Sequence, residues 1–101
     1  MTTITLVCAL GMSTSLMVTK MNLAAMKGSI DVKIRAVPES NFDQYESDTN
    51  ILLLGPQVGY KLNKMKAQYE PKGLKVAVIN GMDYGTMNGE KVLKDALALL
   101  K

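Results

Sequence analysis

The sequence has no histidine and only one cysteine, Cys8, and these two shortages exclude several kinds of catalytic site. Without histidine the chain cannot build a Ser-His-Asp or Cys-His catalytic group of its own. One thiol and scattered carboxylates are poor ligands for zinc, so we expect neither a metal nor a cofactor. A single cysteine cannot form an internal disulfide, and nothing in the composition points to an oxidising compartment.

Charged side chains are absent from residues 1–19, yet this stretch resembles neither an export signal nor a membrane span. A signal peptide needs basic residues near its start, whereas the first lysine is Lys20. Threonine, serine and glycine interrupt the apolar run, which argues against a spanning helix. The net charge is +3 and the lysines are spread along the chain, a pattern that does not favour nucleic-acid binding. We therefore expect a cytoplasmic protein.

Four short runs predict β-strands at residues 4–7, 32–37, 51–54 and 75–79. The first and third runs are almost wholly apolar, which is typical of strands covered on both faces. In the second run Val32, Ile34 and Ala36 alternate with Lys33 and Arg35. This alternation predicts a strand with one exposed side, at an edge of the sheet.

Helical patterns occur between and after these strands, over residues 13–27, 40–47, 58–69 and 90–100. We expect Gly28 to end the first helix and Asn88 to cap the last. The resulting order, β-α-β-α-β-α-β-α, predicts a single α/β domain over residues 1–101. Its sheet should be parallel, with helices on both faces and right-handed crossovers.

Six of the eight methionines form two groups by their predicted position. Met17, Met21 and Met65 fall on apolar helix faces and are expected in the core. Met12, Met82 and Met87 fall in predicted loops, where they could instead form a soft docking surface.

Cys8 lies where the first strand gives way to the first helix, and small polar residues follow it. If that strand is central, Cys8 lies at the switch point where parallel sheets bind ligands. Backbone amides of such a turn and of the helix start form an anion site, and Gly11 permits a tight turn. The electric field of these amides and of the helix start also lowers the pKa of a nearby thiol. We interpret the segment as a cradle for a phosphorylated cysteine.

Other interpretations of Cys8 stay open at this point. A buried, inert cysteine followed by an ordinary capped helix is one of them, in a small anion-binding or interaction domain. A cysteine phosphatase or arsenate-type reductase is another, because the spacing Cys8-x5-Thr14-Ser15 resembles C-x5-R followed by serine or threonine. However, Thr14 replaces the arginine that clamps the phosphoryl group. Redox exchange lacks a second thiol, and a nucleotide P-loop lacks its Gly-Lys-Ser/Thr.

Residues 8–16, CALGMSTSL, resemble the phosphocysteine loop of the IIB components of the sugar phosphotransferase system (PTS), in the lactose/cellobiose group. The likeness spans the whole chain and is greater to the cellobiose/chitobiose branch. Leu10, where a smaller residue is expected, is a minor departure. Further matching segments are Pro38-Glu39, residues 53–57 (LLGPQ), Tyr60, Tyr84-Gly85 and Asn88-Gly89.

This resemblance implies a flavodoxin-like fold with four parallel strands, similar to low-molecular-weight tyrosine phosphatases. It also implies that Cys8 accepts a phosphoryl group from a phosphohistidine of the IIA protein. Phospho-Cys8 would then phosphorylate a sugar held by the membrane transporter IIC, for instance a β-linked disaccharide such as cellobiose or chitobiose. The chain would be a monomer that reaches the inner face of the membrane only through IIC. The phosphoryl oxygens would be bound by backbone amides of Leu10, Gly11, Met12, Ser13, Thr14 and Ser15, with help from the hydroxyls of the last three.

Two further loops are expected at the same end of the sheet. Gly55-Pro56-Gln57 follows the third strand and either flanks the pocket or forms a plain turn. Asp83-Tyr84-Gly85 follows the fourth strand, where related phosphatases carry a general-acid aspartate. A carboxylate beside a thiophosphate would repel it or promote hydrolysis. We therefore expect Asp83 to be a solvated loop residue and Tyr84 to serve packing or partner contact.

Overall fold

The computed structural model describes the backbone of residues 1–8 and 11–100 and the side chains of residues 1–7 and 14–100. The strands are β1 (Thr2–Cys8), β2 (Val32–Pro38), β3 (Ile51–Leu54) and β4 (Lys75–Val78). The α-helices are α1 (Gly11–Lys27), α2 (Leu62–Tyr69), α3 (Gly81–Gly85) and α4 (Gly89–Ala98). Short 3₁₀ helices are η1 (Glu39–Gln44), η2 (Glu46–Asp48), η3 (Pro56–Lys61) and η4 (Glu70–Lys72).

The four strands form one parallel sheet in the order β2-β1-β3-β4. The predicted strands are therefore confirmed, with β1 inside the sheet and β2 at an edge. Ile4 and Leu6 of β1 and all four residues of β3 are buried, as their apolar runs predict. Lys33 on β2 is exposed, in agreement with the predicted alternation.

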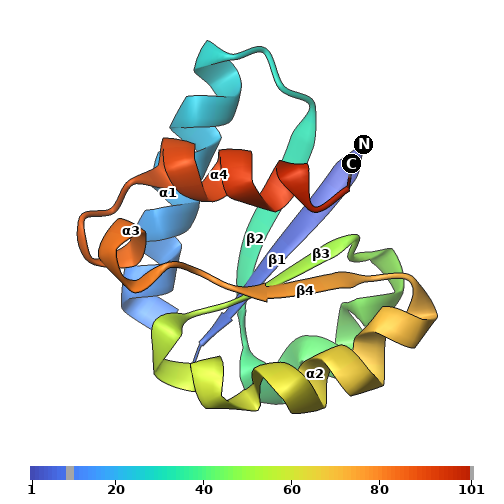
Figure 1. The fold of residues 1–101 in the computed structure, drawn as a ribbon. Helices are drawn as coiled ribbons and strands as arrows, with labels where there is room; N and C mark the ends of the chain where they lie inside the picture. The colour runs from blue at the N-terminus through green and yellow to red at the C-terminus, as the bar shows by residue number, and fades with distance from the viewer. Residues whose placement is uncertain (9–10, 101) are drawn as a thin grey trace.

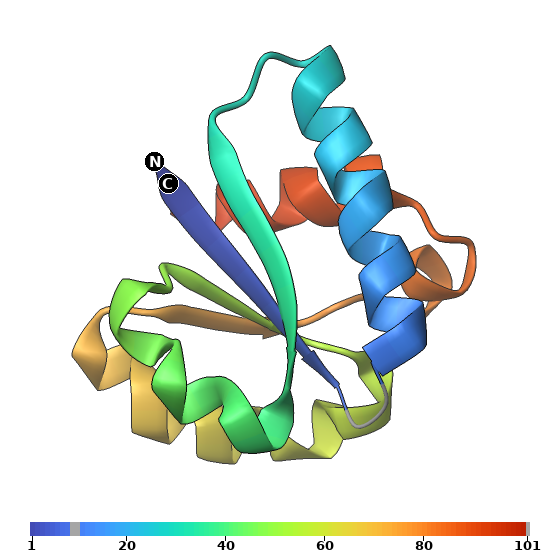
Figure 2. The same cartoon turned by 180° about the vertical axis from the view of Figure 1, so that it is seen from behind.

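Helices cover both faces of the sheet, as predicted (Figure 1). Helices α1, α3 and α4 lie on one face, and α2 with the 3₁₀ helices lies on the other. Figure 2, the view from behind, brings α1 and the edge strand β2 to the front. Each face has its own apolar cluster because neighbouring residues of a strand point to opposite sides. The first cluster is centred on Ile4, Leu6, Met17, Met21, Leu53 and Leu93, and the second on Val7, Phe42, Leu52, Leu54, Met65 and Tyr69.

Helix α1 ends at Lys27 and Gly28 follows it directly, as predicted. Ser29, not Gly28, has the left-handed conformation, with φ of 53°. The amide of Ser29 donates to the carbonyl of Met26, and that of Ile30 to the carbonyl of Ala25. These two bonds form a Schellman motif, in which the left-handed residue comes one position after the helix cap.

Four other predictions for the helical segments are corrected by the structure. The helix predicted over residues 58–69 is regular only from Leu62, because Val58 is buried with non-helical dihedral angles inside η3. Residues 81–85, expected as a loop, form α3, and the predicted 40–47 helix consists of η1 and η2. The helix predicted over residues 90–100 is α4, which runs from Gly89 to Ala98. The side chain of Asn88 caps it, as predicted.

Gly89 marks the closest approach of α4 to α1. A Cβ atom at this position would lie 2.4 Å from the carbonyl carbon of Lys20 and 2.6 Å from the amide nitrogen of Met21. Both are backbone atoms, which cannot move aside as a flexible side chain would. The absence of a side chain at Gly89 therefore sets the distance between the two helices.

Arg35 joins the edge strand β2 to the segment that follows η1. Its guanidinium donates hydrogen bonds to the hydroxyls of Thr5 and Thr49, to the carbonyl of Tyr45 and to both carboxylate oxygens of Asp48. It also lies over the Tyr45 ring, 4.7 Å from the ring centroid. This hydrogen bonding holds the pKa of Asp48 below its ordinary value of 3.8.

Replacing Gly89 by alanine should lower the free energy of unfolding by about 2–3 kcal/mol, because the new methyl group must push α4 away from α1. Gly85→Ala is a matched control, since nothing lies within 4 Å of a Cβ there. We expect the control to leave stability nearly unchanged. Urea unfolding of both variants measures the effect, and equal losses in the two would contradict the proposed steric cause.

Replacing Arg35 by lysine should destabilise the fold by about 1–3 kcal/mol at pH 7, because an ammonium cannot reproduce the guanidinium's several bonds. The pKa of Asp48 is lowered in the folded state, so its ionised form stabilises the fold above the unfolded pKa, near pH 4. That contribution is lost as the pH falls further. Urea unfolding at pH 7 and pH 3 should therefore show a smaller difference between wild type and variant at pH 3. A difference independent of pH would argue against the Asp48 contact.

Candidate functional site

Cys8 is the last residue of β1, and turns from the neighbouring strands flank it on both sides. In the parallel register Cys8 is opposite Pro38, the last residue of β2. On the other side, the amide of Gly55 donates to the carbonyl of Val7 at 2.9 Å. Strands β2 and β3 follow β1 in sequence but lie on its opposite sides. Cys8 is therefore at the switch point of the sheet, where parallel folds bind ligands.

The amino end of α1 follows Cys8 closely. The helix begins at Gly11, three residues on, and runs for 17 residues with no acidic residue in its first turn. Free amides and the helix dipole make such an end attractive to anions, and no carboxylate of that turn opposes the effect. This placement is the one that the sequence predicts for a bound phosphoryl group.

The predicted phosphate-binding residues are described to different extents. Leu10 and the side chains of Cys8, Gly11, Met12 and Ser13 lie outside the described residues. Thr14 is 1% exposed, and its hydroxyl lies 3.3 Å from that of Tyr84. Ser15 is exposed, and its carbonyl accepts a hydrogen bond from the hydroxyl of Thr19. Phosphate binding by these residues stays a prediction.

The two turns that flank Cys8 are tied together by a salt bridge that the sequence did not indicate. Lys61 at the end of η3 donates to the carboxylate of Glu39 at the start of η1. This hydrogen bond raises the pKa of Lys61 above its ordinary value. The two residues are 22 positions apart. No sequence pattern predicts that two charged residues at that spacing form a salt bridge.

Asp83 does not match the expected solvated loop residue. It lies in the first turn of α3, and its side chain is only 17% exposed. Its carboxylate is 3.7 Å from the ammonium of Lys91 on α4. The hydrogen bond to Asp95, and secondarily the charge of Asp83, raise the pKa of Lys91. Asp83 thus takes part in the junction of α3 and α4.

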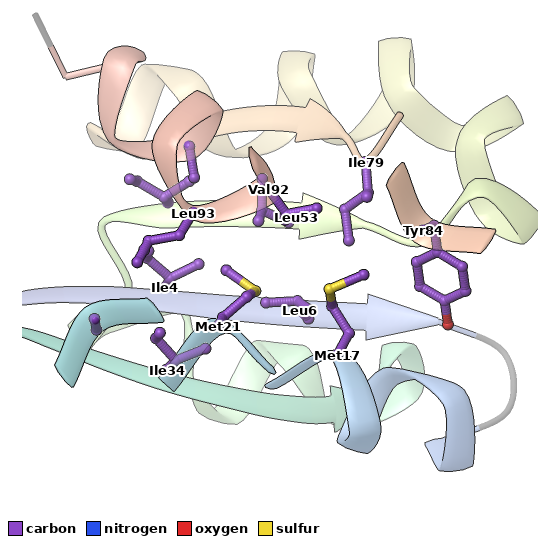
Figure 3. Packing of buried hydrophobic residues seen from close by; sticks show 13 residues of the cluster. Ile4, Leu6, Met17, Met21, Ile34, Leu53, Ile79, Tyr84, Val92 and Leu93 are labelled. Atoms are coloured by element: carbon purple, nitrogen blue, oxygen red, sulfur yellow. The ribbon is translucent and has the colours of Figure 1, made fainter. Parts of the chain in front are cut away.

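Tyr84 is a core residue, as the packing interpretation predicts. It is 7% exposed and belongs to the cluster under α1 and α4. Figure 3 shows its ring beyond the Met17 side chain, near the end of β1. Its hydroxyl is the group that meets Thr14. No sequence pattern indicates this contact, because the two residues are 70 positions apart.

Three of the exposed large apolar side chains lie around the carboxyl end of the sheet. Tyr60 on η3 is 80% exposed, Met82 on α3 is 78% exposed, and Leu16 on α1 is about half exposed. We call these three residues the docking rim. Of the three methionines predicted to form a docking surface, Met82 is exposed as expected. Met87 is instead half-buried against the core, and the side chain of Met12 lies outside the described residues.

Met17, Met21 and Met65 are buried, which confirms their expected place in the core. Among the described residues there is no group of three or more His, Cys, Asp or Glu side chains that could hold a metal ion. Nor does any helix of residues 1–8 and 11–100 combine the length and apolarity needed to cross a membrane.

Residues 3–95 match the family described as "PTS system, Lactose/Cellobiose specific IIB subunit". The chain belongs to this family of IIB components. Its α/β fold with four parallel strands is therefore the flavodoxin-like fold that the sequence resemblance implied.

Three curated relatives from bacteria support the assignment to the IIB family. The galactose-specific and the cellobiose-specific EIIB components of two Lactococcus lactis strains (subsp. cremoris MG1363 and subsp. lactis IL1403) are each 40% identical to this chain. The oligo-beta-mannoside-specific EIIB component of Bacillus subtilis (strain 168) is 33% identical. Each match covers 96% of this chain and 94% of the relative.

Two solved IIB structures have a closely similar fold. The cellobiose-specific IIB protein of Borrelia burgdorferi superposes with a TM-score of 0.79 at 37% identity, covering 97% of this chain and 90% of that one. The lactose-specific IIB domain of Streptococcus pneumoniae gives a TM-score of 0.85, with 99% and 98% covered. At 19% identity the second comparison supports the fold alone.

Proposed function

We propose that this IIB component carries a phosphoryl group on Cys8, between a phosphohistidine of IIA and a sugar bound by IIC. In the first step the Cys8 thiolate attacks phosphorus, the S–P bond forms and the N–P bond to the imidazole breaks. In the second step a sugar hydroxyl attacks phosphorus, the S–P bond breaks and the thiolate is regenerated. The hydroxyl proton leaves to solvent or to a base of the transporter.

The observation that carries this proposal is the place of Cys8 in a PTS IIB fold. It ends the inner strand β1 just ahead of the amino end of α1, whose first turn has no acidic side chain. A helix start favours the thiolate and also the phosphoryl dianion bonded to it. In-line transfer depends mainly on such positioning and charge stabilisation. Phosphate binding by the amides and hydroxyls of residues 10–15 belongs to this proposal.

A carrier must hold its phosphoryl group without losing it to water, and two features favour carriage over hydrolysis. The chain has no histidine that could activate a water molecule. Asp83 follows β4, where related phosphatases carry a general-acid aspartate. Its carboxylate instead lies 3.7 Å from the Lys91 ammonium in the α3–α4 junction. The histidine that the first step requires would be supplied by IIA.

The sugar and the cellular location follow from the family and not from this chain's own geometry. Curated relatives are named for cellobiose, galactose and oligo-beta-mannosides, so we infer a β-linked disaccharide as the sugar. Selection of the sugar would rest with IIC. The chain would then act at the cytoplasmic face of the membrane, as one IIB domain over residues 1–101.

The docking rim fits the role of a surface that meets IIA transiently. Tyr60, Met82 and Leu16 come from three elements that lie around the end of β1 in Figures 1 and 2. Exposed aromatic and methionine side chains bind well to partners because they bury apolar area and adapt in shape. We infer that the three side chains of the docking rim contact IIA around Cys8 when IIA is bound.

The central test is intact-protein mass spectrometry after incubation with phosphorylated IIA. Wild type should gain one phosphoryl group, and Cys8→Ala should gain none, because the acceptor sulfur is absent. An adduct on the variant would show that another residue is the acceptor. No adduct on wild type would contradict the proposal, and steady release of phosphate from an aryl phosphate would favour the hydrolase interpretation.

Met82→Ser should raise the KM for phosphorylated IIA about three- to ten-fold and leave kcat unchanged, because the rim contributes to binding and not to the chemical step. Met26→Ser is the matched control, since Met26 is 75% exposed but lies near the far end of α1. Steady-state transfer kinetics measure both constants. Equal effects in the two variants would argue against the rim as the docking surface.

A further inference from the structure

The hydroxyls of Thr14 and Tyr84 meet inside the protein, 3.3 Å apart. Thr14 is in the first turns of α1, and Tyr84 is in α3, beyond the end of β4. Their side chains are 1% and 7% exposed, so neither group is free in bulk solvent. This contact connects α1, the helix that starts beside Cys8, to α3, which follows the last strand of the sheet.

Tyr84 is held firmly on the α3 side of this contact. The side chain of Asn80 accepts hydrogen bonds from the amides of Met82 and Asp83, which caps α3. The amide of Tyr84 donates to the carbonyl of Asn80 at 2.9 Å, and the amide of Asn88 donates to that of Asp83 at 2.8 Å. The Tyr84 ring is packed in the core (Figure 3). The phenol is therefore a fixed point against which α1 can be positioned.

Acidity indicates the direction of the hydrogen bond. A phenol is a much stronger acid than an aliphatic alcohol, so the favoured arrangement has Tyr84 donating and Thr14 accepting. In that arrangement the hydroxyl proton of Thr14 is directed away from Tyr84. The bond then fixes both the rotamer of Thr14 and the direction in which its own hydroxyl donates.

We propose that Tyr84 is a positioning residue for phosphoryl transfer, acting through Thr14 on the first turn of α1. This inference rests on the proposed function of Cys8. A phenylalanine would fill the core equally well. Packing therefore requires the ring of Tyr84 but not its hydroxyl group. Small errors in the place of binding groups slow transfer reactions strongly, and a buried hydrogen bond to a rigid neighbour reduces such errors.

Tyr84→Phe removes this hydroxyl and keeps the ring. We expect kcat for transfer from phosphorylated IIA to Cys8 to fall about three- to ten-fold, the rate equivalent of one neutral hydrogen bond. The KM should stay unchanged, because Tyr84 is buried and does not touch the partner. Tyr69→Phe is the matched control, since Tyr69 is also buried but packs against Phe42 on the opposite face of the sheet. Its transfer rate should equal that of wild type.

A double-mutant cycle tests whether Tyr84 acts through Thr14. Thr14→Val should slow transfer, and adding Tyr84→Phe to it should cause little further loss, because the shared hydrogen bond is already absent. Urea unfolding of each variant shows whether the fold is retained.

Three results would overturn the positioning role. The first is a wild-type rate in Tyr84→Phe, and the second is a raised KM in place of a lowered kcat. The third is an equal loss of transfer rate from Tyr84→Phe in the wild-type and Thr14→Val backgrounds. A wild-type chain that gains no phosphoryl group contradicts the proposed function itself, and the role of Tyr84 falls with it. Phosphorylation of wild type with any of the three results contradicts the role of Tyr84 alone.

Discussion

Strand β1 is paired on both sides and packed on both faces, and the position of every other part of the site depends on this. Ile4 and Leu6 face one apolar cluster and Val7 faces the other. The hydrogen bonds to β2 and β3 fix the register of the strand down to Cys8. Because parallel strands end at one edge, the same arrangement brings the starts of α1, η1 and η3 around Cys8. The inner position of β1 in the sheet therefore determines where the site lies.

Long-range contacts between described residues hold together the elements that surround Cys8. Glu39 and Lys61 join the flanking turns, and Thr14 and Tyr84 join α1 to α3. Close packing at Gly89 sets α4 against α1, and α3 precedes it by a short turn. The phosphoryl transfer proposed for Cys8 would need such support, because its chemistry would rely on the placement of amides and hydroxyls and less on proton transfer.

Much of the fold was predictable because its signals are local. The apolar runs at residues 51–54 and 4–7 predicted buried strands, and the alternation around Ile34 predicted an edge strand. Helix α3 was missed because five residues show no periodicity, and its stability comes from the Asn80 cap and the α4 junction. Val58 shortened α2 for a similar reason, since burial in the core overrides local helix preference.

Sequence patterns alone predicted the α/β class, the inner place of β1, the position of Cys8 ahead of a helix, and the resemblance to the IIB family. These features depend on the order and apolarity of short segments, which are properties of neighbouring residues. The folded structure adds that Tyr84 meets Thr14, that Asp83 faces Lys91, and that Gly89 lies against the α1 backbone. Each of these contacts joins residues from different elements, and their distances are set by how the helices pack on the sheet.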